Sequence, residues 1–140
     1  MNKIGCVVAL IAIAAVASSP AGADGALAVG STSDVIKDGI AVGTSINYKT
    51  ADEAAAAALQ RCHDYKPAPK AAALCMSVGT LKGECYAVSF DPKAGTPGAG
   101  WAIASTKALA EERAIANCKI TAGEGRRDFC RIEESKCDEY

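Results

Sequence analysis

The sequence predicts an α+β fold in which two pseudo-repeated strand-strand-helix-strand units pack as one small disulfide-stapled domain. Residues 25–45, GALAVGSTSDVIKDGIAVGTS, and residues 85–106, CYAVSFDPKAGTPGAGWAIAST, share one pattern: an apolar strand, a turn of small and polar residues, and a second apolar strand. Each stretch is followed by an Ala-rich segment with helical periodicity that ends in a cysteine. A unit of this size cannot bury both of its faces alone, so two copies are expected to stack.

The first 23 residues have the three-part pattern of a cleaved secretory signal peptide. Lys3 provides the positive start, residues 4–17 form an apolar run, and Ala21-Gly22-Ala23 is an A-x-A cleavage signal. The run is shorter than the roughly 20 residues of a membrane span, so the mature chain is expected to have none. Cys6 lacks the preceding hydrophobic region of a lipoprotein signal and is expected to leave with the peptide. Residues 24–140 then form a single domain of two internal repeats, about 25–84 and 85–140.

In the first unit, strands are expected at 26–29 and 40–46, joined by a turn-rich segment. Thr50, with Glu53 three residues later, predicts a capping box that starts a helix ending at Cys62. Two prolines stop this helix, and CMSVGTL, residues 75–81, is the third strand.

The second unit follows the same order. Strands are expected at 86–90 and 101–104, a helix from Thr106 to Cys118, a break at GEGRRDF, and a third strand from Cys130.

Six cysteines remain after removal of the leader, an even number that indicates three disulfides in an oxidising compartment. Each helix ends at a cysteine, and another cysteine opens the strand that follows. A short connection that returns to the same sheet would bring the two Cα atoms within disulfide distance, so Cys62 is expected to pair with Cys75 and Cys118 with Cys130. Cys85 and Cys137 remain, at the two unit ends, and their bond is expected to join the first unit to the second.

Charge argues against a nucleic-acid partner. Loss of Lys3 changes 15 basic and 16 acidic residues to 14 and 16, a net charge of −2 with histidine neutral. A nucleic-acid binder needs a basic stripe. Arg126 and Arg127 form the one close basic pair, and Glu124 and Asp128 flank it, which predicts a solvated ion-paired loop.

No catalytic, cofactor or metal site is predicted from motifs. His63 is the only histidine and follows a helix end, where a capping role is expected. The cysteine spacing does not match that of zinc sites. Serine-hydrolase motifs are absent, and GTPGAGW lies between two strands and lacks the lysine of a phosphate loop.

Two single residues need a separate interpretation. Aligning the cysteine-ended helices places Glu111 on Ala55, so a carboxylate interrupts the apolar face of the second helix. It is either a rim residue whose head group reaches solvent or a partly buried functional acid. Trp101, aligned with Ile40, is expected in the core between the two Ala-rich helices.

The whole of this arrangement resembles the small secreted bacterial proteins of the domain-of-unknown-function 4189 family. The resemblance lies in GALAVGST, in ADEAAAAALQRC with ALCMSVGTLKGECYAVSFDP, and in GTPGAGWAIASTKALAEERAIANC ending at FCRIEESKCD. It implies a compact, exported α+β domain with disulfides and no established activity, so it transfers no functional residue.

The favoured function is an exported, non-enzymatic interaction or binding module for an unknown protein or envelope ligand, located in the periplasm or secreted. One alternative is a small envelope-acting enzyme with Glu111 as its acid. A cleft holding Glu111, a second carboxylate and aromatic side chains would favour that alternative. The other is a secreted inhibitor or effector of an enzyme, which an exposed, rigid apolar hairpin tip would favour.

Overall fold

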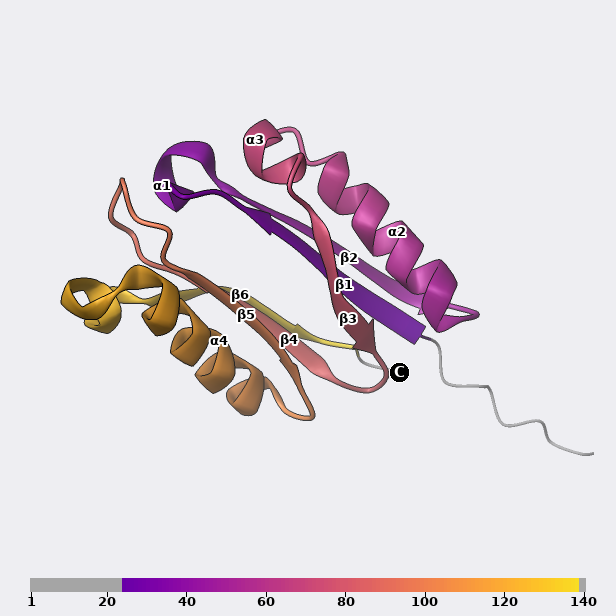
Figure 1. The fold of residues 1–140 in the computed structure, drawn as a ribbon. Coiled ribbons are helices and arrows are strands. Elements are labelled where there is room, and N and C mark those ends of the chain that lie inside the picture. Colours follow the sequence, from indigo (N-terminus) through magenta and orange to yellow (C-terminus); the bar gives the residue numbers. More distant parts are fainter. Residues whose placement is uncertain (1–23, 139–140) are drawn as a thin grey trace, which may run out of the picture.

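A computed structural model describes residues 24–138, which form two halves of the same topology (Figure 1). The predicted signal peptide, residues 1–23, lies outside the described residues. The first half contains β1 (Asp24–Ser31), α1 (Val35–Asp38), β2 (Ile40–Tyr48), α2 (Ala51–His63), α3 (Pro69–Ala72) and β3 (Met76–Leu81). The second half contains β4 (Cys85–Phe90), β5 (Ala99–Ala104), α4 (Lys107–Ala122), the 3-10 helix η1 (Glu124–Phe129) and β6 (Arg131–Cys137).

Each half is one three-stranded antiparallel sheet with its first strand in the centre. The orders are β2-β1-β3 and β5-β4-β6. Both central strands carry a register shift against their third strand, between Leu27 and Ala28 in β1 and between Val88 and Ser89 in β4. The matching irregularities give a residue-by-residue correspondence between the halves, in which Ala28 corresponds to Ser89.

The molecule has four layers, helix, sheet, sheet and helix. Figure 1 shows α2 and α4 on the two outer sides, with the two sheets between them. The inner faces of the sheets meet in a core of aliphatic and aromatic side chains: Leu27, Val29, Leu81, Tyr86 and Val88. The stacking expected from the sequence is therefore a packing of sheet on sheet. No helix among residues 24–138 is long and apolar enough to cross a membrane.

Trp101 lies in a different place from the one the sequence predicts. It is half-buried against the core between the sheets. Trp101 pairs with Val88 in the second sheet, and at the matching position of the first sheet Thr44 pairs with Leu27. Thr44, not Ile40, is thus its counterpart. The helices lie on opposite outer faces, so no side chain can pack between them.

Both long helices begin at a threonine. Thr50 Oγ1 accepts a hydrogen bond from the Glu53 amide at 3.2 Å, and Thr106 Oγ1 accepts one from the Leu109 amide at 3.2 Å. Within residues 24–138 the Glu53 carboxylate accepts no bond in return, so only half of the predicted capping box forms. The second helix also continues one turn past Cys118, where Thr121 Oγ1 donates to the Ala99 carbonyl at 2.7 Å.

Small residues allow each helix to lie very close to its sheet. A Cβ placed on Gly43 would lie 2.1 Å from the Ala58 carbonyl oxygen, and one on Gly100 would lie 2.2 Å from that of Ala114. No side chain fits in either place. The alanines of the two helices are thus required for this close approach as well as for helix propensity.

Three disulfides join the pairs expected from the sequence. Cys62–Cys75 and Cys118–Cys130 link helix ends to the following strands, with Cα atoms 5.9 and 6.0 Å apart. Cys85 and Cys137 are also bonded, but the expectation that they join the two halves is wrong. They lie directly opposite each other on β4 and β6, within the second sheet. The halves are joined instead by the packing of one sheet on the other and by the segment of chain that connects β3 to β4.

The Cys85–Cys137 bond should stabilise the fold most, because it closes the longest loop. Its cysteines are 52 residues apart, against 13 for Cys62 and Cys75. We expect replacement of both Cys85 and Cys137 by alanine to lower the unfolding free energy by about 4 kcal/mol. The same replacement of Cys62 and Cys75 should lower it by about 3 kcal/mol. Urea unfolding measures the free energy of unfolding of both variants. A loss in the Cys85/Cys137 variant that is equal to or smaller than that in the Cys62/Cys75 variant would contradict the loop-length argument.

Candidate functional site

A cavity of about 320 Å³ opens between the two sheets at the edge where β2 faces β6. Its apolar wall comes from α1, β2 and β4: Val35, Ile36, Ile40, Val42, Val88 and Phe90. Tyr65, Pro67 and Ala68 line it from the segment between α2 and α3, and Glu133 and Glu134 line it from β6. We call this space the inter-sheet cavity. Its volume and mixed lining are typical of sites for small molecules.

Glu134 is held in place by two donors on the same oxygen. Tyr86 Oη donates to Glu134 Oε1 at 2.7 Å, and Lys136 Nζ lies 2.8 Å from the same atom. Burial favours the neutral acid, but the bonds from Lys136 and Tyr86 outweigh it and lower the pKa of Glu134. Burial and the neighbouring carboxylate raise the pKa of Tyr86 well above its usual range. The pair is therefore an ionised carboxylate and a neutral phenol at neutral pH.

The opposite edge of the sandwich is closed, although the same topology builds it. There β3 contacts β5, and a Cβ on Gly79 would lie 3.1 Å from Cδ1 of Ile103. Aligning Cys75 with Cys130, each just before its third strand, makes Val78 and Gly79 the counterparts of Glu133 and Glu134. An apolar residue and a glycine thus close one edge, and two glutamates line the open one.

The wall formed by α1 is fixed by three polar contacts. The Asp34 carboxylate accepts from the Lys37 amide at 3.1 Å and caps the helix. Lys70 Nζ lies 2.8 Å from Asp38 Oδ1, which ties α1 to α3. The Val35 amide donates to the Thr96 carbonyl at 3.1 Å, which attaches α1 to the β4–β5 loop of the other half.

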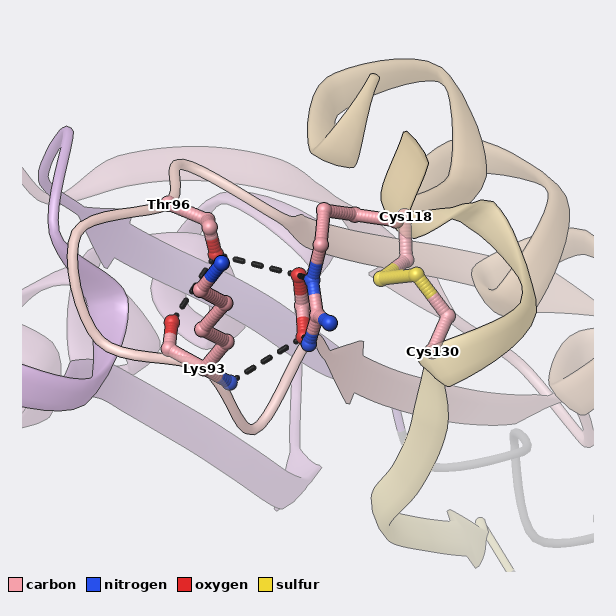
Figure 2. A network of polar contacts seen from close by, with 6 residues as sticks. Lys93, Thr96, Cys118 and Cys130 are labelled. Carbon is pink, nitrogen blue, oxygen red and sulfur yellow. Dashed lines mark hydrogen bonds and ion pairs between the residues drawn. A yellow bond between two sulfur atoms is a disulfide. The ribbon is translucent and has the colours of Figure 1, made fainter. Parts of the chain in front are cut away.

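That loop is organised by Asp91, a fully buried carboxylate. Arg126 donates to it through two nitrogens, Nε to Oδ2 at 2.9 Å and Nη2 to Oδ1 at 2.5 Å. Thr96 Oγ1 and the Lys93 amide also donate to it, at 3.2 and 3.1 Å (Figure 2). The Arg126 guanidinium lowers the pKa of Asp91, although burial opposes the shift.

Arg126 reaches Asp91 because the chain around it is constrained. It lies in η1, inside the segment that the Cys118–Cys130 disulfide closes, and that bond flanks the polar network in Figure 2. Its guanidinium also stacks on the Phe129 ring, 4.0 Å from the centroid. The predicted solvated basic pair is therefore wrong for Arg126. It holds for Arg127, an exposed side chain whose Nη2 lies 3.9 Å from Glu124 Oε1.

Glu111 lies away from the inter-sheet cavity. It is half-exposed on α4 and accepts a hydrogen bond from Ser135 Oγ at 2.5 Å, which links α4 to β6. The shallow depression beside it contains Glu112 and aliphatic side chains but no aromatic residue. Of the two interpretations from the sequence, the rim residue describes this geometry.

His63 and the cysteines have structural positions. His63 is exposed, and its Nδ1 lies 2.8 Å from the Ala72 carbonyl oxygen, so it bridges α2 and α3. All six cysteines of the described chain are in disulfides. Within residues 24–138, no group of three or more His, Cys, Asp or Glu side chains is placed to hold a metal ion.

The sequence did not predict the cavity, the Tyr86–Glu134 pair or the Asp91–Arg126 pair. The correspondence between the halves carries a signal for the last of these. Asp91 aligns with Gly30 and Arg126 with Ala71, so two small residues in one half stand where two charged residues stand in the other. Paired replacement of this kind indicates contact.

Arg126→Ala should lower the melting temperature by more than about 10 °C, because it leaves a buried carboxylate unpaired. Arg127→Ala, one residue away and exposed, is the matched control and should change it little. Because the pKa of Asp91 is lowered, its contribution is present above about pH 4 and is lost as the pH falls further. The stability difference between wild type and Arg126→Ala should therefore shrink in acid. Equal melting temperatures for the two variants would refute the pairing argument.

The hydrogen bond from Ser135 determines what substitutions of Glu111 should do to stability. Glu111→Gln should stay within about 0.5 kcal/mol of wild type, because its carbonyl can still accept from Ser135. Glu111→Ala should cost about 1 kcal/mol, and adding Ser135→Ala should cost little more. Additive losses in the double variant would show that the two side chains act independently.

Comparisons with known proteins agree with the architecture. The family model described as domain of unknown function (DUF4189) matches residues 13–137. No curated protein and no solved structure matches the chain. The matched segment includes both sheets, both long helices and all six disulfide cysteines. The chain therefore belongs to the DUF4189 family.

Proposed function

We propose that this protein is an exported, disulfide-stabilised, non-enzymatic binding module whose ligand occupies the inter-sheet cavity. The observation that carries the proposal is the cavity itself, a space of about 320 Å³ with an apolar wall and two glutamates at one side. Sites for small molecules in proteins have this size and composition.

The difference between the two edges supports this choice of site. Both edges come from the same arrangement of strands, yet Gly79 and Ile103 close one and a cavity occupies the other. Closing an apolar gap would stabilise the fold, so an open cavity costs stability. Proteins tolerate this loss of stability at sites that their function requires, which supports the cavity as the functional site.

Export rests on the chemistry of the cysteines and on the leader. Three disulfides in one small domain are typical of proteins in oxidising compartments. The pattern of residues 1–23 is that of a secretory signal peptide. We infer a periplasmic or secreted location for the mature chain.

The alternatives receive less support. An enzyme that uses Glu111 needs a second carboxylate facing it across a cleft, and the depression beside Glu111 offers only Glu112 on the same helix. An inhibitor needs an exposed apolar tip, but the β4–β5 loop exposes Lys93, Ala94, Gly95 and Pro97. Neither feature meets the requirement of its function.

A fragment screen by NMR tests the proposal. Fragments should shift the amide signals of cavity residues such as Val42 and Val88, without being chemically altered. Ile40→Trp fills the cavity and should abolish these shifts. Ile120→Trp makes the same change on the exposed surface of α4, where Ile120 is 75% exposed, and should preserve them. Binding that survives Ile40→Trp in a folded variant would reject the cavity as the site, and turnover of a fragment would reject a non-enzymatic role.

A further inference from the structure

We propose that the inter-sheet cavity selects small amphipathic cations, with an apolar body between the sheets and an ammonium or amidinium group at the β6 edge. This inference rests on the proposed function, since it names the class of ligand for the same site.

Charge in the lining is of one sign. Glu133 and Glu134 are its charged residues, and no lysine or arginine lines the cavity. Among residues 24–138, Glu133 makes no ion pair. A cationic group that enters beside Glu133 therefore displaces no internal partner and gains a charge-assisted contact.

Glu134 keeps one oxygen available. Tyr86 and Lys136 both contact Oε1, and within the described chain Oε2 accepts no hydrogen bond. About a third of the side chain is exposed, so a ligand can reach this oxygen. The Tyr86 hydroxyl and the Lys136 ammonium fix the carboxylate before a ligand arrives, which lowers the entropic cost of binding.

The position of the two glutamates determines how a ligand would lie. Both project from β6, at one side, whereas Ile40, Val42 and Val88 form the apolar wall. A molecule with separate apolar and cationic ends satisfies both regions at once. A fully polar cation would leave the apolar wall hydrated, and an anion would meet two like charges.

Aromatic rings add a second attraction for a cation. Phe90 already has the Arg131 guanidinium over its ring, 5.1 Å from the centroid. Tyr65, at the rim, is 39% exposed, so its ring is open to a ligand. The cationic side chains of Arg131 and Lys136 lie near this side of the cavity, and both are outside its lining. Arg131 stacks on Phe90, and Lys136 is paired with Oε1 of Glu134.

Three probes with one apolar body test the inference: 4-phenylbutylamine, 4-phenylbutanol and 4-phenylbutyrate. NMR titration of the wild-type protein at pH 7 should show the amine binding at least about 10-fold more tightly than the alcohol, with the acid weakest. The preference should weaken at 0.5 M salt, because exposed carboxylates are screened. Signals of Val42 and Val88 report whether each probe occupies the cavity.

Variants assign the preference to its residues. Glu133→Gln and Glu134→Gln should each reduce the amine-to-alcohol ratio several-fold, while the alcohol affinity stays unchanged. Glu112→Gln, on the outer side of α4, is the matched control and should leave the ratio intact. An unchanged ratio in both cavity variants would overturn the inference.

The failures of the two proposals are distinguishable. If the alcohol or the acid binds in the cavity as tightly as the amine, the selection of cations is refuted and the cavity remains a binding site. If none of the three probes binds there at millimolar concentration, the inference is refuted. The proposed function is lost only if fragments of every class in the screen also fail to bind.

Discussion

The structure depends on the contact between the inner faces of two sheets. Each three-stranded sheet has a helix on its outer face and would otherwise expose its inner face to water. Leu27, Val29 and Val88 are fully buried at this contact, and Tyr86 nearly so. No disulfide crosses it, because each bond lies within one half. The hydrophobic effect therefore holds the halves together, whereas each disulfide stabilises only the half that contains it. The scarcity of large side chains in the helical layers makes this central contact still more important.

Equivalent positions in the two halves solve the same packing problem with different chemistry. Near the end of β1, the central strand of the first half, Gly30 lies so close to α3 that a Cβ would be 2.1 Å from the Ala71 carbonyl oxygen. In the second half the counterparts are Asp91 and Arg126, joined by two hydrogen bonds. Contact between small residues needs only close backbone approach. A buried ion pair needs a correct partner and satisfied oxygens, so it specifies geometry more than it adds stability. Through Thr96 and the Val35 amide, that geometry extends to the wall of the inter-sheet cavity.

Much of the fold was predictable because it depends on local signals. Thr50 and Thr106 fixed where the helices start, and cysteine spacing gave all three disulfide pairs. The role of Cys85–Cys137 was mistaken because spacing does not reveal which strands are neighbours in a sheet. Trp101 was misplaced because the local pattern does not reveal which faces of the two halves meet, and it is the sheets that pack against each other, not the helices. The cavity and the Tyr86–Glu134 pair depend on how two sheets face each other. Such contacts join residues 48 apart in the chain, and no local pattern encodes them.

The open edge of the sandwich follows from the composition of one strand. At the closed edge, β3 presents Val78 and Gly79, and the side chain of Ile103 fills the space beside the glycine. At the matching positions β6 presents Glu133 and Glu134. A dry contact there would bury two carboxylates at a cost that β2, with Ile40 and Val42, cannot offset. The strands β2 and β6 therefore stay apart at this edge, and the apolar side chains behind them remain accessible. The same two residues that prevent closure also give the opening its negative charge, so the existence of the cavity and its preference for cations have one physical cause.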